Sequence, residues 1–234
     1  MSITTNKNSL IERLFEVGAH FGFKKSRRHP TVLPYIYASK FGNDIFDLNK
    51  TVDMLEKAKE VVKDFGKNNK SVLLIGTKKE ISHLVAAQAE KFGLPSVYNR
   101  WIGGMITNFP EVKKRIVSLE AMLAEVESGD MEKKYTKKEQ VLVKREIDKL
   151  KFNFAGLSSL EKNPDLAIVV DSRHESIAVK ELKEKNIPII AISGSDCDLN
   201  GITYPIPVND SLSKSVAVVL DEILTAHEEG GRES

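Results

Sequence analysis

The sequence has a single cysteine, Cys197, among its 234 residues. One cysteine excludes an internal disulfide and leaves no zinc-finger spacing. No run of about eighteen apolar residues occurs, so no membrane-spanning helix is predicted. Residues 1–8 lack the apolar stretch and the cleavage site of a signal peptide. We therefore expect a cytoplasmic protein with no membrane partner.

The glycine and serine patterns of common enzymes are also missing. Neither the dinucleotide fingerprint nor the Walker A loop occurs, and no Gly-x-Ser-x-Gly elbow marks a nucleophilic serine. Cys197 has no arranged partner, which favours a buried thiol. The conceivable metal ligands are His20, Asp171, His174, Asp196 and Asp198. Their spacing matches no metal motif, so we predict neither a metal site nor a cofactor.

Charge is unevenly distributed, although the net charge is only +2. Residues 1–41 contain seven Lys and Arg against two Glu, whereas residues 196–234 contain eight Asp and Glu against two cations. A chain polarised in this way can place its basic part on phosphate and turn its acidic part to solvent or protein. Solvated charged faces are the alternative explanation.

Short apolar runs predict strands that are buried on both faces. These runs are residues 72–75, 166–170, 187–192 and 202–208. Helical patterns end near Lys91, cover residues 177–183 and close the chain at about 211–225. The alternation predicts an α/β fold with three layers, in which a mostly parallel sheet lies between helices.

A helix and a hairpin are predicted before this sheet. The helix has one apolar face, a cap at Asn49 or Thr51, and a stop at Gly66. Residues 35–38 and 45–48 flank a Gly-Asn-Asp turn, which predicts two antiparallel strands.

A different pattern interrupts the α/β alternation between Phe109 and Phe154. Apolar residues recur there every three or four positions in two runs, and Thr136 and Glu139 have the spacing of a capping box. This predicts an inserted antiparallel coiled-coil hairpin, with two core helices of an all-α subdomain as the alternative. The expected units are an α/β domain of residues 1–107 and 156–227, a hairpin of residues 108–155 and a flexible acidic tail of residues 228–234.

Polar residues follow three predicted strands at their carboxyl ends, where doubly wound sheets bind ligands. Amides after Gly76 can meet a phosphate there. An enzyme that binds a nucleotide or a sugar phosphate near Thr77, Asp171 and Asp196 is therefore the alternative function.

Residues 21–30 contain a strongly basic loop. Lys24, Lys25, Arg27 and Arg28 occupy four of five positions beside aromatic residues, and two nearby prolines keep the segment extended or looped. Such cations suit RNA phosphates, and an aromatic ring suits an unpaired base. The alternative is a solvated loop whose aromatics return to the core; we favour it for Phe21 and favour RNA contact for the cations.

The segment 100–108 precedes the predicted hairpin. Arg100 offers a planar fork for phosphate, and Trp101 is large enough to pin the hairpin to the sheet. Gly103 and Gly104 permit close backbone approach or positive φ, and Thr107 or Asn108 can cap the next helix. We interpret Trp101, Gly103 and Gly104 as a structural joint; for Arg100 both roles stay open.

Several stretches resemble the bacterial ribosomal protein S-two family of the small subunit, in family order and spacing. They are residues 17–22, 35–37 with 45–51, 76–79, 100–108, 137–139 and 205–210. The string Arg-Trp-Ile-Gly-Gly-Met-Ile-Thr-Asn at 100–108 is the most specific of them. The family usually has His at the position of Phe23 and Trp-Asn at Arg28-His29, so this loop is more basic than is usual.

The resemblance implies a helix-flanked parallel sheet with an inserted coiled-coil hairpin, and no catalysed reaction. It implies a structural role on the ribosome, with ribosomal RNA and neighbouring small-subunit proteins as partners and, in many bacteria, the large mRNA-binding first protein. The residues expected to contact RNA are Lys24, Lys25, Arg27, Arg28, Lys78, Lys79, Arg100 and Asn108.

Overall fold

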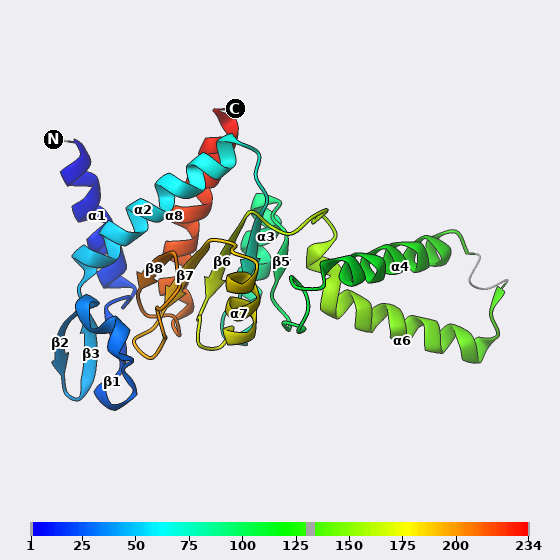
Figure 1. Ribbon diagram of the computed structural model, residues 1–234, viewed down its shortest axis with the longest axis horizontal. Helices are drawn as coiled ribbons and strands as arrows, with labels where there is room; N and C mark the ends of the chain where they lie inside the picture. The colour runs from blue at the N-terminus through cyan, green and yellow to red at the C-terminus, as the bar shows by residue number, and fades with distance from the viewer. Residues whose placement is uncertain (1, 130–133, 234) are drawn as a thin grey trace.

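A five-stranded parallel sheet forms the centre of the protein (Figure 1). The computed structural model describes residues 2–129 and 134–233. The strands lie in the order β5-β4-β6-β7-β8, and each neighbouring pair is parallel. Their bounds are β4 Val72–Ile75, β5 Ser96–Val97, β6 Leu166–Val170, β7 Ile189–Ser193 and β8 Tyr204–Pro207. The short strand β5 was not predicted, because two residues carry no periodicity.

Helices cover both faces of this sheet, which confirms the three-layer prediction. Helices α1 (Ser2–Glu16), α2 (Leu48–Lys67), α3 (Ser82–Phe92) and α8 (Ser213–Arg232) pack on one face. Helix α7 (Ser176–Glu184) packs on the other face. Side chains alternate between the two cores along each strand: Leu74 and Ile168 belong to the first core, Leu73 and Val169 to the second.

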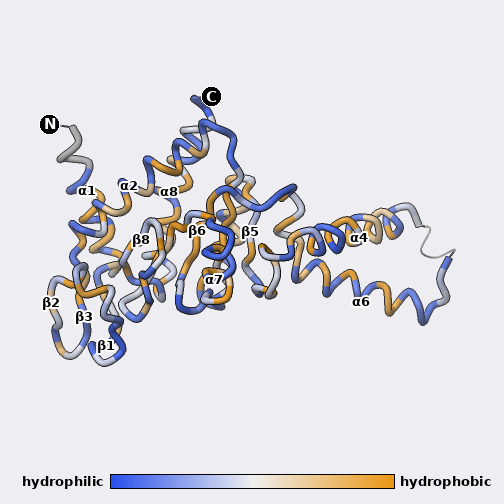
Figure 2. Tube along the Cα trace, viewed as in Figure 1, coloured by the Kyte–Doolittle hydropathy of each residue, from blue (hydrophilic) through white to orange (hydrophobic). Residues whose placement is uncertain are grey.

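Two helices, α4 (Phe109–Glu127) and α6 (Lys137–Phe154), lie side by side and extend away from the sheet beyond β5 (Figure 1). Thr136 and Glu139 form the predicted capping box at the start of α6. Hydrophobic and hydrophilic stretches alternate along α6 in Figure 2, as expected for a helix with one covered face. Where they adjoin the sheet, α4 and α6 belong to its second core through residues such as Ile116 and Leu150. The coiled-coil packing and the domain limits stay predictions.

A small antiparallel sheet of residues 21–46, here called the N-terminal lobe, lies beyond β8 (Figure 1). Its strands β1 (Phe21–Lys24), β2 (Ile36–Lys40) and β3 (Asn43–Phe46) pair in the order β1-β3-β2. The predicted hairpin is confirmed, but its turn consists of Phe41 and Gly42, which both have positive φ. The segment expected to be non-helical contains two 3₁₀ turns, Lys25–Arg27 and Pro30–Tyr35.

Two helix boundaries differ from the prediction. Asp47 caps α2 by accepting a hydrogen bond from Asn49 N, in place of Asn49 or Thr51. Gly66 is the second-last residue of α2, close to the predicted stop, and α8 crosses there: a Cβ on Gly66 would lie 2.3 Å from the carbonyl oxygen of His227. Helix α8 continues to Arg232, so most of the segment predicted as a flexible acidic tail is helical. No helix in the described part of the chain is long and apolar enough to cross a membrane.

Candidate nucleic-acid interface

The carboxyl ends of β4 and β6 carry a network of internal hydrogen bonds. Thr77 donates from its backbone N and its Oγ1 to Glu175 Oε1, at 2.7 and 2.6 Å. The amide expected to meet a phosphate is therefore taken by a carboxylate of the chain itself. Helix α3 begins only at Ser82, so its N-terminus does not follow Gly76 directly. The enzyme alternative relied on this amide, which is thus already paired with Glu175.

Lys78 belongs to the same internal network. Its ammonium lies 2.9 Å from Asp171 Oδ2 and 3.0 Å from Ser211 Oγ. Burial alone would lower the pKa of Lys78, but the hydrogen bond that its ammonium donates to Asp171 and the surrounding carboxylates outweigh it and raise the pKa. Lys78 therefore stabilises the sheet end, whereas the neighbouring Lys79 is exposed.

Asp171, Cys197 and Asp210 bring three potential metal ligands together, all buried and within 4.8 Å of one another. The Cys197 thiol lies 3.8 Å from Asp171 and 3.7 Å from Asp210. Burial and the two carboxylates raise the pKa of this thiol to about 12, so it stays protonated, as predicted for a buried thiol. His20 and Asp198, which were also considered as ligands, are not in this group.

The basic loop, residues 24–28, is divided between anchoring and free cations. Arg27 donates to Asp196 Oδ2 at 2.8 Å, and Arg28 donates to the fully buried Asp44 at 3.2 Å. Lys24 and Lys25 are exposed and form no ion pair with any described residue. The sequence could not distinguish these roles, because the partner carboxylates lie far away in the chain.

Ser195, in the turn after β7, holds the loop against the large sheet. Its Oγ accepts a hydrogen bond from Phe23 N at 2.8 Å, and its carbonyl oxygen accepts one from His29 N at 2.9 Å. A Cβ on Gly22 would lie only 3.0 Å from the Ser195 Oγ, so the two chain segments approach closely. Phe21 does not return to the core, contrary to expectation: it is 53% exposed and packs beside the ring of His20.

The segment 100–108 is organised around the carboxylate of Glu181 in α7. Glu181 accepts hydrogen bonds from Trp101 Nε1 at 3.1 Å, from Gly104 N at 2.8 Å, and from Ile106 N at 3.1 Å. Thr107 adds its backbone N at 3.1 Å and its Oγ1 at 3.2 Å. Burial alone would raise the pKa of Glu181, but these donors outweigh it and hold the pKa below its ordinary value.

Glu181 was not among the predicted functional residues. In the sequence, Glu181 stands out only as an acid between the apolar residues Ala178 and Leu182 of a predicted helix. This pattern does not identify the groups that it binds. The buried Trp101 and the positive φ of Gly104 agree with a structural joint, whereas Gly103 is exposed and a Cβ there would touch nothing within 4 Å. Asn108 stands at the start of α4, but its side chain makes no capping hydrogen bond.

Residues 14–230 match the family model described as Ribosomal protein S2. The chain belongs to the ribosomal protein S2 family. It is 39% identical over 220 residues to the small ribosomal subunit protein uS2 of Petrotoga mobilis, covering 94% of this chain and 76% of that relative. It is 40% identical over 221 residues to the uS2 of Dictyoglomus thermophilum, covering 94% and 89%.

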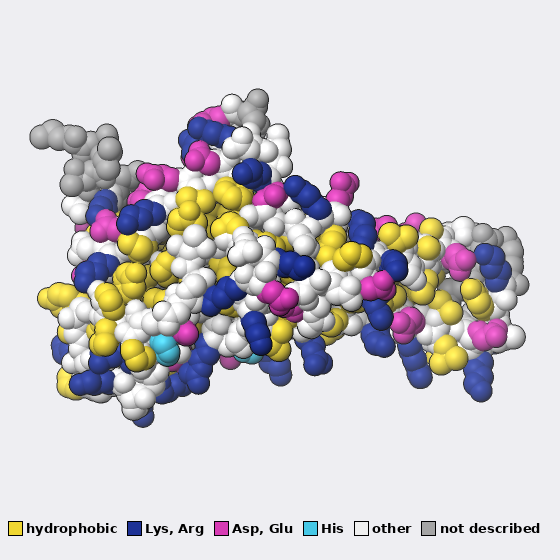
Figure 3. Space-filling view, in the orientation of Figure 1, with side chains coloured by type: hydrophobic (Ala, Val, Ile, Leu, Met, Phe, Trp, Pro, Cys, Tyr) yellow, Lys and Arg dark blue, Asp and Glu magenta, His cyan; other side chains and the backbone are white. Residues whose placement is uncertain are grey.

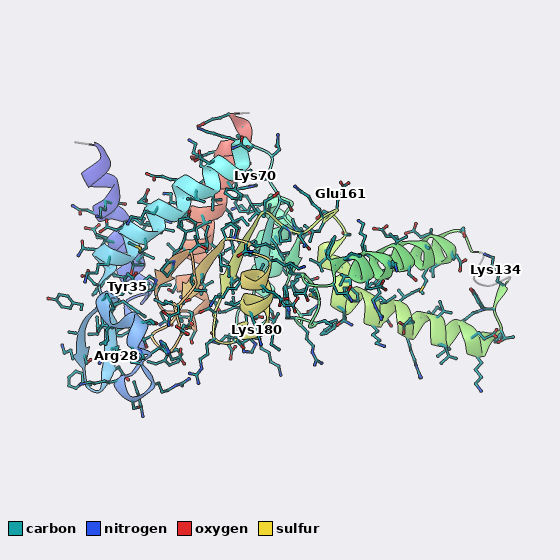
Figure 4. The ribbon with its side chains drawn as sticks, viewed as in Figure 1. Arg28, Tyr35, Lys70, Lys134, Glu161 and Lys180 are labelled. Carbon is teal, nitrogen blue, oxygen red and sulfur yellow. The ribbon has the colours of Figure 1, made fainter. Side chains whose placement is uncertain are left out.

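In this S2 family member, cations gather along one edge of the molecule. Figure 3 shows Lys and Arg side chains along the lower edge, below the N-terminal lobe, α7 and the hairpin. Lys180 on α7 lies at this edge, and Arg28 lies in the lobe (Figure 4). Arg100 and Asn108 are exposed, and Arg100 forms no ion pair within the described ranges. The surface offers positive charge to a partner from the lobe to the hairpin.

Proposed function

We propose that the protein is a structural component of the small ribosomal subunit that contacts ribosomal RNA through exposed cations of the basic loop. The observation that carries the proposal is the pair Lys24 and Lys25, exposed and unpaired within the described structure on a loop that the sheet holds in place. Lysines of this kind suit contact with backbone phosphate, and a fixed loop loses little entropy on binding. The relatives, which are named small ribosomal subunit proteins, support the same role and a cytoplasmic location.

Lys79 and Arg100 are exposed and are proposed as further phosphate contacts, as is the exposed Asn108 at the start of α4. Arg28 is proposed to act indirectly, because its ion pair with Asp44 fixes the loop. For Lys78 the internal pair with Asp171 supports a structural role instead of direct contact.

The hairpin is proposed as a contact for neighbouring ribosomal proteins. Val117, Val141, Leu142 and Phe152 expose large apolar side chains on α4 and α6. Apolar groups exposed on a slender helical pair suit a protein surface better than a phosphate backbone. Docking of the large mRNA-binding first protein stays a prediction.

A salt titration of RNA binding tests the proposal. Replacing Lys24 and Lys25 with Gln should lower the slope of log K against log salt by about 0.7–0.9 for each phosphate that the loop no longer neutralises. The matched control replaces Lys57 and Lys185, two exposed lysines outside the loop, with Gln and should leave the slope unchanged. An equal slope in the loop variant and the wild type would contradict the proposal.

A further inference from the structure

Two arginines from distant parts of the chain share one carboxylate oxygen. Arg27 of the basic loop and Arg173, which follows β6, both donate to Asp196 Oδ2. The Asp196 side chain is 5% exposed, whereas those of Arg27 and Arg173 are 53% and 56% exposed. The carboxylate is therefore covered, and both guanidinium groups face solvent.

This arrangement leaves positive charge in excess. Two cations on one anion leave a net charge of about +1, and each guanidinium has five N–H donors, most of which have no partner among the described residues. Neither arginine reaches a second carboxylate within the described residues. The Arg27 guanidinium also lies 4.5 Å from the centre of the Phe23 ring, which fixes its position. The donors are thus held in place before any ligand binds.

A surface pocket of about 390 Å³ opens next to Arg173 and Asp196. Lys180 and Ser176, one turn apart on α7, line the same pocket, and both are exposed. Asp198 also lines it, but its carboxylate lies 3.8 Å from the His29 ring. Hydroxyl, ammonium and guanidinium groups therefore surround a space large enough for a phosphate.

We infer that Arg27 and Arg173, bridged by Asp196, form a binding site for one backbone phosphate of RNA, with Lys180 on its rim. The inference rests on the proposed function and adds Arg173 and Lys180 to the contacts. A phosphodiester fits better than an isolated carboxylate of a protein, because the exposed Lys24 and Lys25 lie in the same loop as Arg27 and a nucleic acid supplies regularly spaced phosphates.

The test is the salt dependence of RNA binding by the full chain carrying Arg173→Gln. The slope of log K against log salt should fall by about 0.7–0.9, and binding at 0.1 M salt should weaken about five- to eightfold. Arg173→Lys, which keeps the charge, should keep the slope. Lys185→Gln, an exposed lysine at the other end of α7, is the control and should change neither quantity. Urea unfolding of each variant confirms that it folds, and Lys180→Gln gives a second, independent change at the rim.

The outcomes separate this inference from the proposed function. If the Lys24 and Lys25 variant lowers the slope but Arg173→Gln and Lys180→Gln do not, the phosphate site is refuted and the proposed function stands. If none of these variants lowers it, both are refuted. Titration with inorganic phosphate tests the other source of the same chemistry. If Arg173→Gln abolishes phosphate binding and leaves the RNA slope unchanged, the site takes free phosphate, which would overturn the RNA assignment.

Discussion

Replacing Glu181 with Gln should loosen the joint between the sheet and the hairpin without leaving a cavity. The carboxylate accepts two hydrogen bonds on Oε1 and three on Oε2. A glutamine supplies one oxygen and one NH₂ group, so at least two donors from the segment 100–108 would face another donor. Each buried donor left unsatisfied costs about 1–3 kcal/mol. We expect a decrease of about 3 kcal/mol in the free energy of unfolding, at the low end of the cost of breaking a buried charged contact.

Urea unfolding measures this decrease, and Trp101 gives a local signal. Trp101 is the only tryptophan, and its indole N–H donates to Glu181, so its fluorescence reports directly on the joint. The variant should show a lower urea midpoint and a shifted native emission spectrum. The control is Glu184→Gln, which replaces an exposed acid on the same helix. Its free energy of unfolding should stay within about 0.5 kcal/mol of the wild-type value.

The pH dependence gives a second check. Because the pKa of Glu181 lies below its ordinary value of 4.5, its stabilisation is present above that value and is lost as the pH falls through the folded-state pKa. The difference between the wild type and the Gln variant should therefore narrow below about pH 4.5. The reasoning would be refuted if the free energy of unfolding of Glu181→Gln lay within about 1 kcal/mol of the wild-type value and the Trp101 emission were unchanged.

Three further predictions concern other parts of the fold. Gly66→Ala should lower the free energy of unfolding in urea by about 1–3 kcal/mol, because α8 leaves no room for a Cβ at this position. The control Gly231→Ala should not lower it, because a Cβ there meets nothing within 4 Å. Equal effects of the two substitutions would contradict the close crossing of α2 and α8. Burial and the neighbouring Asp171 raise the pKa of Asp210 from 3.8 to about 7, so this carboxyl favours the folded state at low pH, and that contribution is lost as the pH rises through about 7. The free energy of unfolding of Asp210→Asn should therefore rise relative to that of the wild type as the pH increases from about 4 to about 7. A difference between the two proteins that does not change with pH would disprove the raised pKa of Asp210. Deleting residues 121–145 with a short bridge should keep cooperative unfolding but reduce incorporation into small subunits; loss of cooperativity would show that the outer hairpin belongs to the core.

Local patterns predicted the framework of this fold well. The runs 72–75 and 166–170 are strands β4 and β6, because a strand buried on both faces must be apolar throughout. The capping box at Thr136 was also predictable from a local pattern, because its two partners lie three residues apart. Gly66 lies next to the end of α2, close to the predicted stop, but its close contact with α8 was not predicted, because a glycine that stops a helix and one that admits a crossing helix look alike in sequence.

The candidate site depended instead on pairs that no local pattern contains. Arg27 and Arg28 looked equivalent to Lys24 and Lys25 in sequence, yet the arginines have carboxylate partners and the lysines have none among the described residues. Arg173 was not among the residues expected to contact RNA, because the turn that brings Asp196 to it lies in another βα unit. Charge could be counted from the sequence, but its pairing required the tertiary structure.

Two anchors of the basic loop, Ser195 and Asp196, come from late in the chain, and this sets an order for its completion during synthesis. Phe23 and Ser195 are 172 residues apart, and Arg27 and Asp196 are 169 residues apart. At roughly 5–20 residues per second, the loop leaves the peptidyl-transferase centre on the order of 10–30 s before its anchors are made. Until then Arg27 lacks the carboxylate that holds it, and the Phe23 N–H lacks the Ser195 hydroxyl that accepts its hydrogen bond. Translation into the last fifth of the chain is therefore the step that completes the anchoring of the basic loop.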